Sequence, residues 1–182
     1  MDRTAKFLGA VLLALIIVAP LAEATQVLYK SPQQLGTESA LVVRGEVTGV
    51  RSYWNQSGTK IITRTSISVD DTYKGVSGRS IDIVQLGGVV GDVRVTVHGA
   101  LSWTPGEEVL LFLEPHTGGD WRVSGFFQGK YNVVRDQNGR AFIKNVTAGD
   151  TELVGAPGAG GQPRLSGPVA LDDFVNQALG RR

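Results

Sequence analysis

The sequence predicts a mainly β fold: a small, closed or partly open β-barrel with a short helix near each end. Stretches of alternating apolar and polar residues recur along the chain, and glycine-rich turns separate them. The apolar stretch 109–113 (VLLFL) is typical of a central strand that is buried on both faces. Closing a sheet removes exposed edges, and glycines within strands permit the bending that closure needs. A two-sheet sandwich is the alternative.

Residues 1–24 have the pattern of a secretory signal peptide. Basic Arg3 and Lys6 precede an apolar stretch, and Ala22-Glu23-Ala24 provides the small residues of a cleavage site after Ala24. The apolar stretch is shorter than the roughly 20 residues that a membrane-spanning helix needs. We therefore predict a periplasmic or extracellular protein that has no stable membrane anchor after cleavage.

The mature chain begins with one helix and one strand. Residues 31–40 form the predicted helix, with Ser31 as N-cap and Pro32 at the first helical position. Residues 41–50 (LVVRGEVTGV) alternate like a half-buried strand, in which Gly45 indicates a bulge or a sharp bend. The expected inner face of this strand consists of Leu41, Val43, Gly45 and Val47.

Further strands are predicted in the middle of the chain. Residues 60–73 and 79–86 alternate in the same way, and 93–97 (VRVTV) forms a shorter strand. The glycine-rich stretch 87–92 between the last two is interpreted as a loop, and 109–113 is the central strand. Each boundary falls at a glycine or a polar turn.

The last strands precede a linker. Residues 121–134 predict one strand or a strongly bent pair, interrupted at Gly125 and Gly129. The turn 136–139 (DQNG) contains Asn-Gly, which is the strongest short hairpin signal, and 141–145 returns from it.

The predicted domain organisation has three parts after the signal peptide. The β-barrel domain covers 25–154, a flexible glycine- and proline-rich linker covers 155–168, and an amphipathic helix covers 169–182. The apolar stripe of this helix consists of Leu171, Phe174, Val175 and Ala178. Whether the helix packs on the barrel or contacts a partner is left open by the pattern.

The composition of the chain excludes several classes of function. The 18 basic and 17 acidic residues give a net charge of +1, which lacks the electrostatic signature of a nucleic-acid-binding protein. The chain has no cysteine, so disulfides, thiol catalysis and lipid anchors attached through cysteine are excluded.

Four short motifs resemble a known family. They are Val43-x-Gly45-x-Val47, Tyr73-Lys74-Gly75, Pro105-Gly106-Glu107 and Gln128-Gly129-Lys130-Tyr131. The chain is similar over about residues 31–135 to small exported bacterial proteins, related segments of which lie beside matrixin-like metalloprotease domains. Its strand order also resembles the netrin-like barrel of tissue inhibitors of metalloproteinases, an OB-type fold.

That resemblance implies an exported peptidase-like protein as candidate partner. The inhibitors, however, bind the protease zinc through an N-terminal cysteine, whereas the predicted mature chain starts at Thr25 and contains no cysteine. Inhibition by that mechanism is therefore not implied.

Aromatic residues near turns and glycines in a loop are the candidate binding residues, because tryptophan and tyrosine contribute strongly to interfaces and loops often bind ligands. They are Tyr53, Trp54, Trp103, Gly87, Gly88 and Gly91. The alternative is that the aromatic side chains fill the barrel ends and that the glycines only connect strands.

No catalytic pattern accompanies these residues. His98 and His116, the only 2 histidines, lack the spacing of metal ligands, and the sequence contains neither HExxH nor GxSxG. We expect no catalytic residue, metal or cofactor, and predict a non-catalytic binding or interaction module of the bacterial envelope, a partner or regulator of an exported peptidase. The alternatives are an exported hydrolase that uses His98 or a carboxylate pair, and a purely structural envelope protein. The oligomeric state is not predicted.

Overall fold

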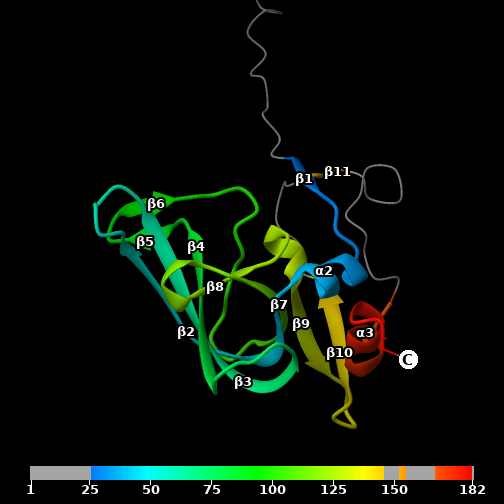
Figure 1. The fold of residues 1–182 in the computed structure, drawn as a ribbon. Coiled ribbons are helices and arrows are strands. Elements are labelled where there is room, and N and C mark those ends of the chain that lie inside the picture. Colours follow the sequence, from blue (N-terminus) through cyan, green and yellow to red (C-terminus); the bar gives the residue numbers. More distant parts are fainter. Residues whose placement is uncertain (1–25, 146–151, 155–166, 182) are drawn as a thin grey trace, which may run out of the picture.

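The computed structural model describes residues 26–145, 152–154 and 167–181 (Figure 1). The predicted signal peptide and nearly all of the predicted linker lie outside these residues. Strands make up 50% and helical segments 17%, which confirms the mainly β prediction. Within the described ranges, no helix is both long enough and apolar enough to cross a membrane.

Eight strands form the main sheet, in the order β12-β10-β9-β7-β2-β3-β4-β8. Their bounds are β2 (Leu41–Trp54), β3 (Ile61–Lys74), β4 (Ser80–Leu86), β7 (Glu108–Pro115), β8 (Trp121–Val123), β9 (Lys130–Arg135), β10 (Ala141–Asn145) and β12 (Val169–Ala170). Strand β8 also pairs with β7, so the pairings run from β7 through β2, β3, β4 and β8 back to β7.

Alternation along these strands builds the first core, as predicted. Its buried side chains are Leu41, Val43, Val47, Ile67, Ile81, Ile83, Val109, Leu111 and Leu113. The pairing of β2 with β3 shifts register between Arg44 and Gly45, which confirms the expected bulge. A side chain at Gly45 would meet the Ser68 carbonyl oxygen at 2.2 Å, so only glycine fits this close approach.

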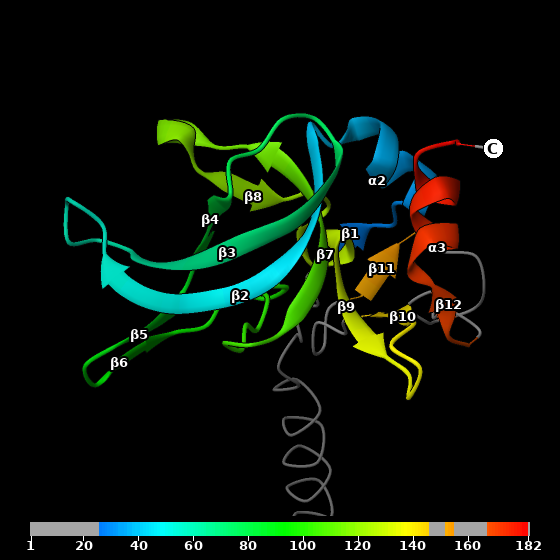
Figure 2. The same ribbon diagram turned by 90° about the horizontal axis from the view of Figure 1, so that it is seen from below.

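The two helices build a second core on the other face of β7. Helix α2 (Pro32–Glu38) begins with the predicted Ser31 cap, and α3 (Leu171–Ala178) packs beside it (Figure 2). This core consists of Leu35, Val42, Leu110, Phe112, Tyr131, Val133, Ile143, Leu171, Phe174, Val175 and Ala178. The predicted stripe of the C-terminal helix therefore packs on the sheet. A side chain at Gly36 would meet the Ala178 carbonyl oxygen at 2.0 Å, so the helices touch at this glycine.

Three predictions about elements need correction or refinement. The predicted loop 87–92 contains β5 (Gly88–Val90), which pairs with β6 (Val93–Val95) because Gly91, at φ 57°, permits a tight turn. The C-terminal helix starts later than predicted, because β12 pairs with β10 instead. The bent pair at 121–134 is interrupted by a 3-10 helix, η3 (Phe126–Gly129). Another such helix, η2 (Thr117–Gly119), follows β7, and a small parallel pair joins β1 (Gln26–Leu28) to β11 (Glu152–Val154).

Candidate binding cleft

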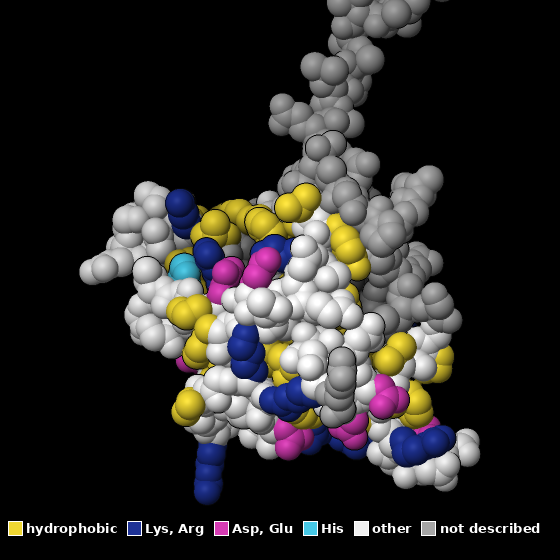
Figure 3. Space-filling view, turned by 45° about the vertical axis from the view of Figure 1, so that its right-hand side comes forward, with side chains coloured by type: hydrophobic (Ala, Val, Ile, Leu, Met, Phe, Trp, Pro, Cys, Tyr) yellow, Lys and Arg dark blue, Asp and Glu magenta, His cyan; other side chains and the backbone are white. Residues whose placement is uncertain are grey.

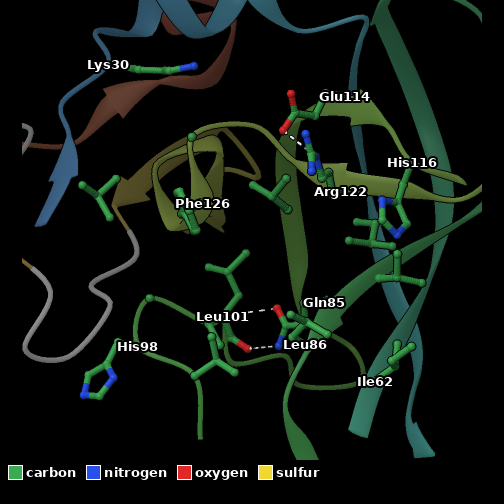
Figure 4. Close-up of a pocket in the computed structure, with 18 of the residues that line it drawn as sticks. Lys30, Ile62, Gln85, Leu86, His98, Leu101, Glu114, His116, Arg122 and Phe126 are labelled. Atoms are coloured by element: carbon green, nitrogen blue, oxygen red, sulfur yellow. Dashed lines mark hydrogen bonds and ion pairs between the residues drawn. The ribbon is translucent and has the colours of Figure 1, made fainter. Parts of the chain in front are cut away.

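A cleft opens where β4 and β8 separate. Strand β4 pairs with β3 along its whole length, from Ser80 to Leu86, but it pairs with β8 only at Ile83 and Trp121. Beyond this bridge the strands diverge around a cavity of about 560 Å³ (Figure 4). That volume lies within the range of about 300–1,000 Å³ typical of ligand sites.

Several segments of the chain line the cleft, and most of the lining side chains are apolar. The lining includes Val27 and Leu28 of β1, Ile83 to Leu86 of β4, 97–101 of the following loop, and Val123, Gly125 and Phe126 from β8 and η3. Figure 4 shows Gln85, Leu86 and Leu101 on one side of the cleft and Glu114 and Arg122 on the other.

Large apolar side chains at this site are exposed to solvent. The exposed fractions are 69% for Leu28, 49% for Leu86 and 60% for Phe126. Hydrophobic side chains also gather in the upper part of the face shown in Figure 3, close to charged side chains and histidine. Apolar side chains that cluster at a cavity, unlike isolated ones, are typical of binding sites.

Phe126 also has an unusual backbone. Its φ is 60°, and it is the one non-glycine residue with a positive φ among the described residues. A left-handed conformation costs a residue with a Cβ about 1–2 kcal/mol. Strain of this kind concentrates at functional sites, where the surrounding structure maintains it. The aromatic ring is thus held at the cleft at a cost in backbone energy.

Charged side chains at the cleft form pairs. The Nε of Arg122 donates to Oε1 of Glu114 at 2.8 Å, and the Nζ of Lys30 lies 2.5 Å from Oε2 of Glu38. Both histidines, His98 and His116, also line the cavity, but on opposite sides of it (Figure 4). In the described part of the chain, no group of three His, Cys, Asp or Glu side chains is placed to hold a metal ion.

One side chain of β4 holds the loop that forms one wall. The Nε2 of Gln85 donates to the Leu101 carbonyl at 2.8 Å, and its Oε1 accepts from the Leu101 amide at 3.2 Å. The same oxygen accepts from Nε1 of Trp103 at 3.3 Å. These bonds of the Gln85 side chain fix the loop against the strand.

A buried lysine holds the next part of the same loop. The Nζ of Lys130 donates to the Ser102 carbonyl at 2.7 Å and to Oε2 of Glu107 at 2.8 Å, and it lies 4.5 Å from the centre of a Trp103 ring. Only 2% of Lys130 is exposed. Burial lowers the pKa of Lys130, and the Glu107 carboxylate acts in the opposite direction.

The opposite wall is tied to the same segment of the chain. The Nε2 of Gln128 donates to the Leu28 carbonyl at 3.0 Å, and its Oε1 accepts from the Lys30 amide at 2.8 Å. Gln128 and Lys130 therefore fix two separate walls of the cleft from positions two residues apart. The motif Gln128-Gly129-Lys130-Tyr131 is the sequence signal for this arrangement, because it places two polar side chains next to buried apolar strands.

The aromatic and glycine residues predicted from the sequence lie elsewhere. Tyr53 and Trp54 end β2; the Tyr53 hydroxyl accepts from Nε of Arg64 at 3.4 Å, and Trp54 is 40% exposed. Trp103 packs between two apolar clusters, behind the cleft.

The predicted glycines lie near the end of β2. The amide of Gly87 donates to the Ile61 carbonyl, opposite Trp54, and a side chain at Gly88 would meet the Ser52 and Thr63 hydroxyls at 2.3 and 2.4 Å. Gly91 forms the turn between β5 and β6. Neither these glycines nor the three aromatic residues line the cleft, whose own residues the sequence reasoning missed.

No model of a known protein family matches the chain, and a search of curated proteins gives no match. The geometry of the cleft is therefore the basis for a proposed function.

Proposed function

We propose that this protein is a non-catalytic binding module of the bacterial envelope, in the periplasm or outside the cell, and that the cleft between β4 and β8 holds an apolar ligand. The observation that carries the proposal is the cavity of about 560 Å³ with its apolar lining and its exposed Leu28, Leu86 and Phe126. We further propose that the ring of strand pairings is a small OB-type barrel and that the partner is an exported, peptidase-like protein.

The energetics favour binding at this position. Removing apolar surface from water contributes about 25 cal/mol per Å², so a ligand that covers the three exposed side chains gains several kcal/mol. Gln85, Gln128 and Lys130 hold the walls through hydrogen bonds. A preformed site loses little conformational entropy when a ligand binds, so more of the free energy of apolar burial contributes to affinity.

Polar groups at the cleft support binding rather than hydrolysis. Glu114 and Arg122 form an ion pair, and among the described residues no hydrogen bond joins a hydroxyl to a histidine. The nearby Ser124 hydroxyl accepts from Ser39 at 2.9 Å. A nucleophilic serine needs a base within hydrogen-bond reach, which this arrangement does not supply.

A titration with the neutral apolar dye N-phenyl-1-naphthylamine tests the proposal. We expect saturable enhancement of dye fluorescence, weakened about fivefold or more by Leu28→Asp, because the charge opposes burial of the dye. Val76→Asp is the matched control, since Val76 is 90% exposed and lies away from the cleft. Absence of saturable binding, or equal effects of the two substitutions, would overturn the proposal.

A further inference from the structure

We propose that the ligand is an extended peptide segment of a partner protein, which pairs as an added strand with the open edge of β4. This inference rests on the proposed function, because it assigns a chemical class to the occupant of the same cleft. Addition of a peptide strand to a sheet edge is a general mode of recognition, in which backbone hydrogen bonds give affinity and side-chain pockets give specificity.

Two hydrogen bonds show which groups of β4 face the cleft. The Gly87 amide donates to the Ile61 carbonyl at 2.9 Å, and the Val69 amide donates to the Arg79 carbonyl at 2.8 Å. Backbone groups alternate in direction along a strand, so the odd-numbered residues of β4 face β3. The N–H and C=O groups of Val84 and Leu86 therefore point to the opposite edge.

That edge is unoccupied beyond the bridge to β8. Strand β8 pairs with β4 only at Ile83, and within the described ranges no other strand pairs with this edge. Val84, Gln85 and Leu86 all line the cleft. The parallel bridge at Ile83 uses the N–H of its neighbour Val84, and the Gln85 backbone faces β3, so the open groups are the C=O of Val84 and the N–H and C=O of Leu86.

The polar edge distinguishes a peptide from a lipid-like ligand. An acyl chain in this cleft would cover the N–H and C=O groups of Leu86 without pairing them, at a cost of about 1–3 kcal/mol for each group. A peptide backbone supplies the missing donors and acceptors. Its alternate side chains would point toward the apolar lining at Leu101 and Val123.

Charge at the cleft adds a preference for a carboxylate. The two cationic side chains in the lining are Lys30 and Arg122; Lys30 is paired with Glu38, so Arg122 is the candidate to bind an added carboxylate. The Arg122 side chain is 56% exposed, and its bond to Glu114 uses Nε, one of the three nitrogens of the guanidinium group. Arginine binds carboxylates through paired nitrogens. We therefore expect an apolar segment that carries an acidic group near this side of the cleft.

Competition against the bound dye tests this inference. The probes are six-residue acetylated peptides in which valine, leucine or phenylalanine alternates with threonine and the last residue is aspartate. We expect at least one to displace the dye. Its analogue carries N-methyl groups on alternate amides, namely those that would pair with β4. This analogue should bind at least tenfold more weakly, because methylation removes the donors and blocks the edge. Decanoate, which has an apolar chain and a carboxylate but no amides, is the matched comparison.

The outcomes separate the two proposals. Dye binding with displacement by decanoate and by no peptide would overturn the peptide inference and leave the binding function in place. Equal affinity of the methylated and unmethylated peptides would also overturn it. No dye binding and no peptide binding would overturn both. Displacement of the dye by a second copy of the chain, detected as dimerisation, would assign the cleft to self-association and reject the partner peptide.

A pair of variants tests the edge itself. Leu86→Pro removes the N–H that faces the cleft, and Leu86→Ala removes the side chain but keeps the N–H. Proline is tolerated at a strand edge whose N–H does not pair within the sheet, so both variants should unfold at similar temperatures. We expect Leu86→Pro to weaken peptide binding at least fivefold relative to Leu86→Ala, with equal dye binding. Should the proline variant not fold, hydrogen exchange of the Leu86 amide in the unmodified protein decides: lack of protection of this amide by bound peptide contradicts strand addition.

Discussion

Replacing Lys130 by methionine tests how much one buried ion pair beside the cleft contributes to the stability of the fold. Lys130 is 2% exposed and donates to Oε2 of Glu107 at 2.8 Å and to the Ser102 carbonyl at 2.7 Å. Methionine has a similar length, so the substitution removes the charge and the donors without opening a large cavity. The main consequence is a Glu107 carboxylate without its partner.

The expected loss of stability follows from the burial of the two groups. Breaking a fully buried ion pair costs about 3–5 kcal/mol, because one charge remains buried and unpaired. The Glu107 side chain is 17% exposed, so water partly replaces the lost partner and the lower end applies. The contact of Nζ with the Trp103 ring contributes about 1 kcal/mol more. We therefore expect Lys130→Met to lower the free energy of unfolding by about 3–4 kcal/mol.

Urea unfolding followed by tryptophan fluorescence measures this loss. Lys144→Met, on an exposed residue of β10, is the control and should change stability by less than about 0.5 kcal/mol. Adding Glu107→Leu to Lys130→Met removes the unpaired carboxylate and should restore about 2 kcal/mol. A loss below 1 kcal/mol in the single variant, or no recovery in the double variant, would refute the reasoning.

Three further predictions concern other parts of the molecule. Phe126→Gly should be more stable than Phe126→Ala by about 1 kcal/mol in urea unfolding, because glycine relieves the strain at φ 60°, while both variants weaken dye binding. Phe174→Ala should lower the unfolding free energy by about 3–5 kcal/mol with dye affinity retained, since this ring is 1% exposed and packs in the helical core. For Glu108, burial acts to raise the pKa, but hydrogen bonds from Arg135 and Arg44 outweigh it and hold the pKa below its usual 4.5. Its stabilising effect is therefore present above about pH 4.5 and lost as pH falls through the lower folded value, so Glu108→Gln should make the difference in stability between pH 7 and pH 3 smaller.

Local patterns in the sequence predicted most elements of the fold. The alternation in 41–50 and 60–73 matches the buried and exposed faces of β2 and β3, because each strand has one face in a core. Ser31 and Pro32 marked the start of α2 through capping chemistry, which depends only on neighbouring residues. The apolar stripe of α3 likewise appears in the helix's own sequence.

Elements that depend on distant partners were harder to predict. Strands β5 and β6 have three residues each, too few for alternation to be recognised. Val169 and Ala170 are apolar residues that precede a helix, and only their pairing with β10 makes them a strand. Whether a short segment forms a strand is decided by its partner, which lies outside the local sequence.

The cleft could not be predicted for a related reason. The pattern of β4 is the same before and after Ile83, so nothing in it shows that the partner on one edge ends there. Lys130 carried a usable signal, because a lysine between buried strands requires a partner. Glu107, in the motif Pro105-Gly106-Glu107, is that partner. Pairing charged residues between motifs would have located this contact, although not the cavity beside it.

The distribution of apolar surface argues that the cleft is a feature of the fold and not a deficiency in packing. Both helices cover the β7, β9 and β10 side of the sheet, where Phe112 and Phe174 are fully buried. On the side of β4 and β8, Leu28 and Phe126 remain exposed although Gln128 holds both adjoining segments in place. A chain that fixes these walls by specific hydrogen bonds and leaves the space between them unfilled keeps a preformed cavity, which is the arrangement that the proposed binding function requires.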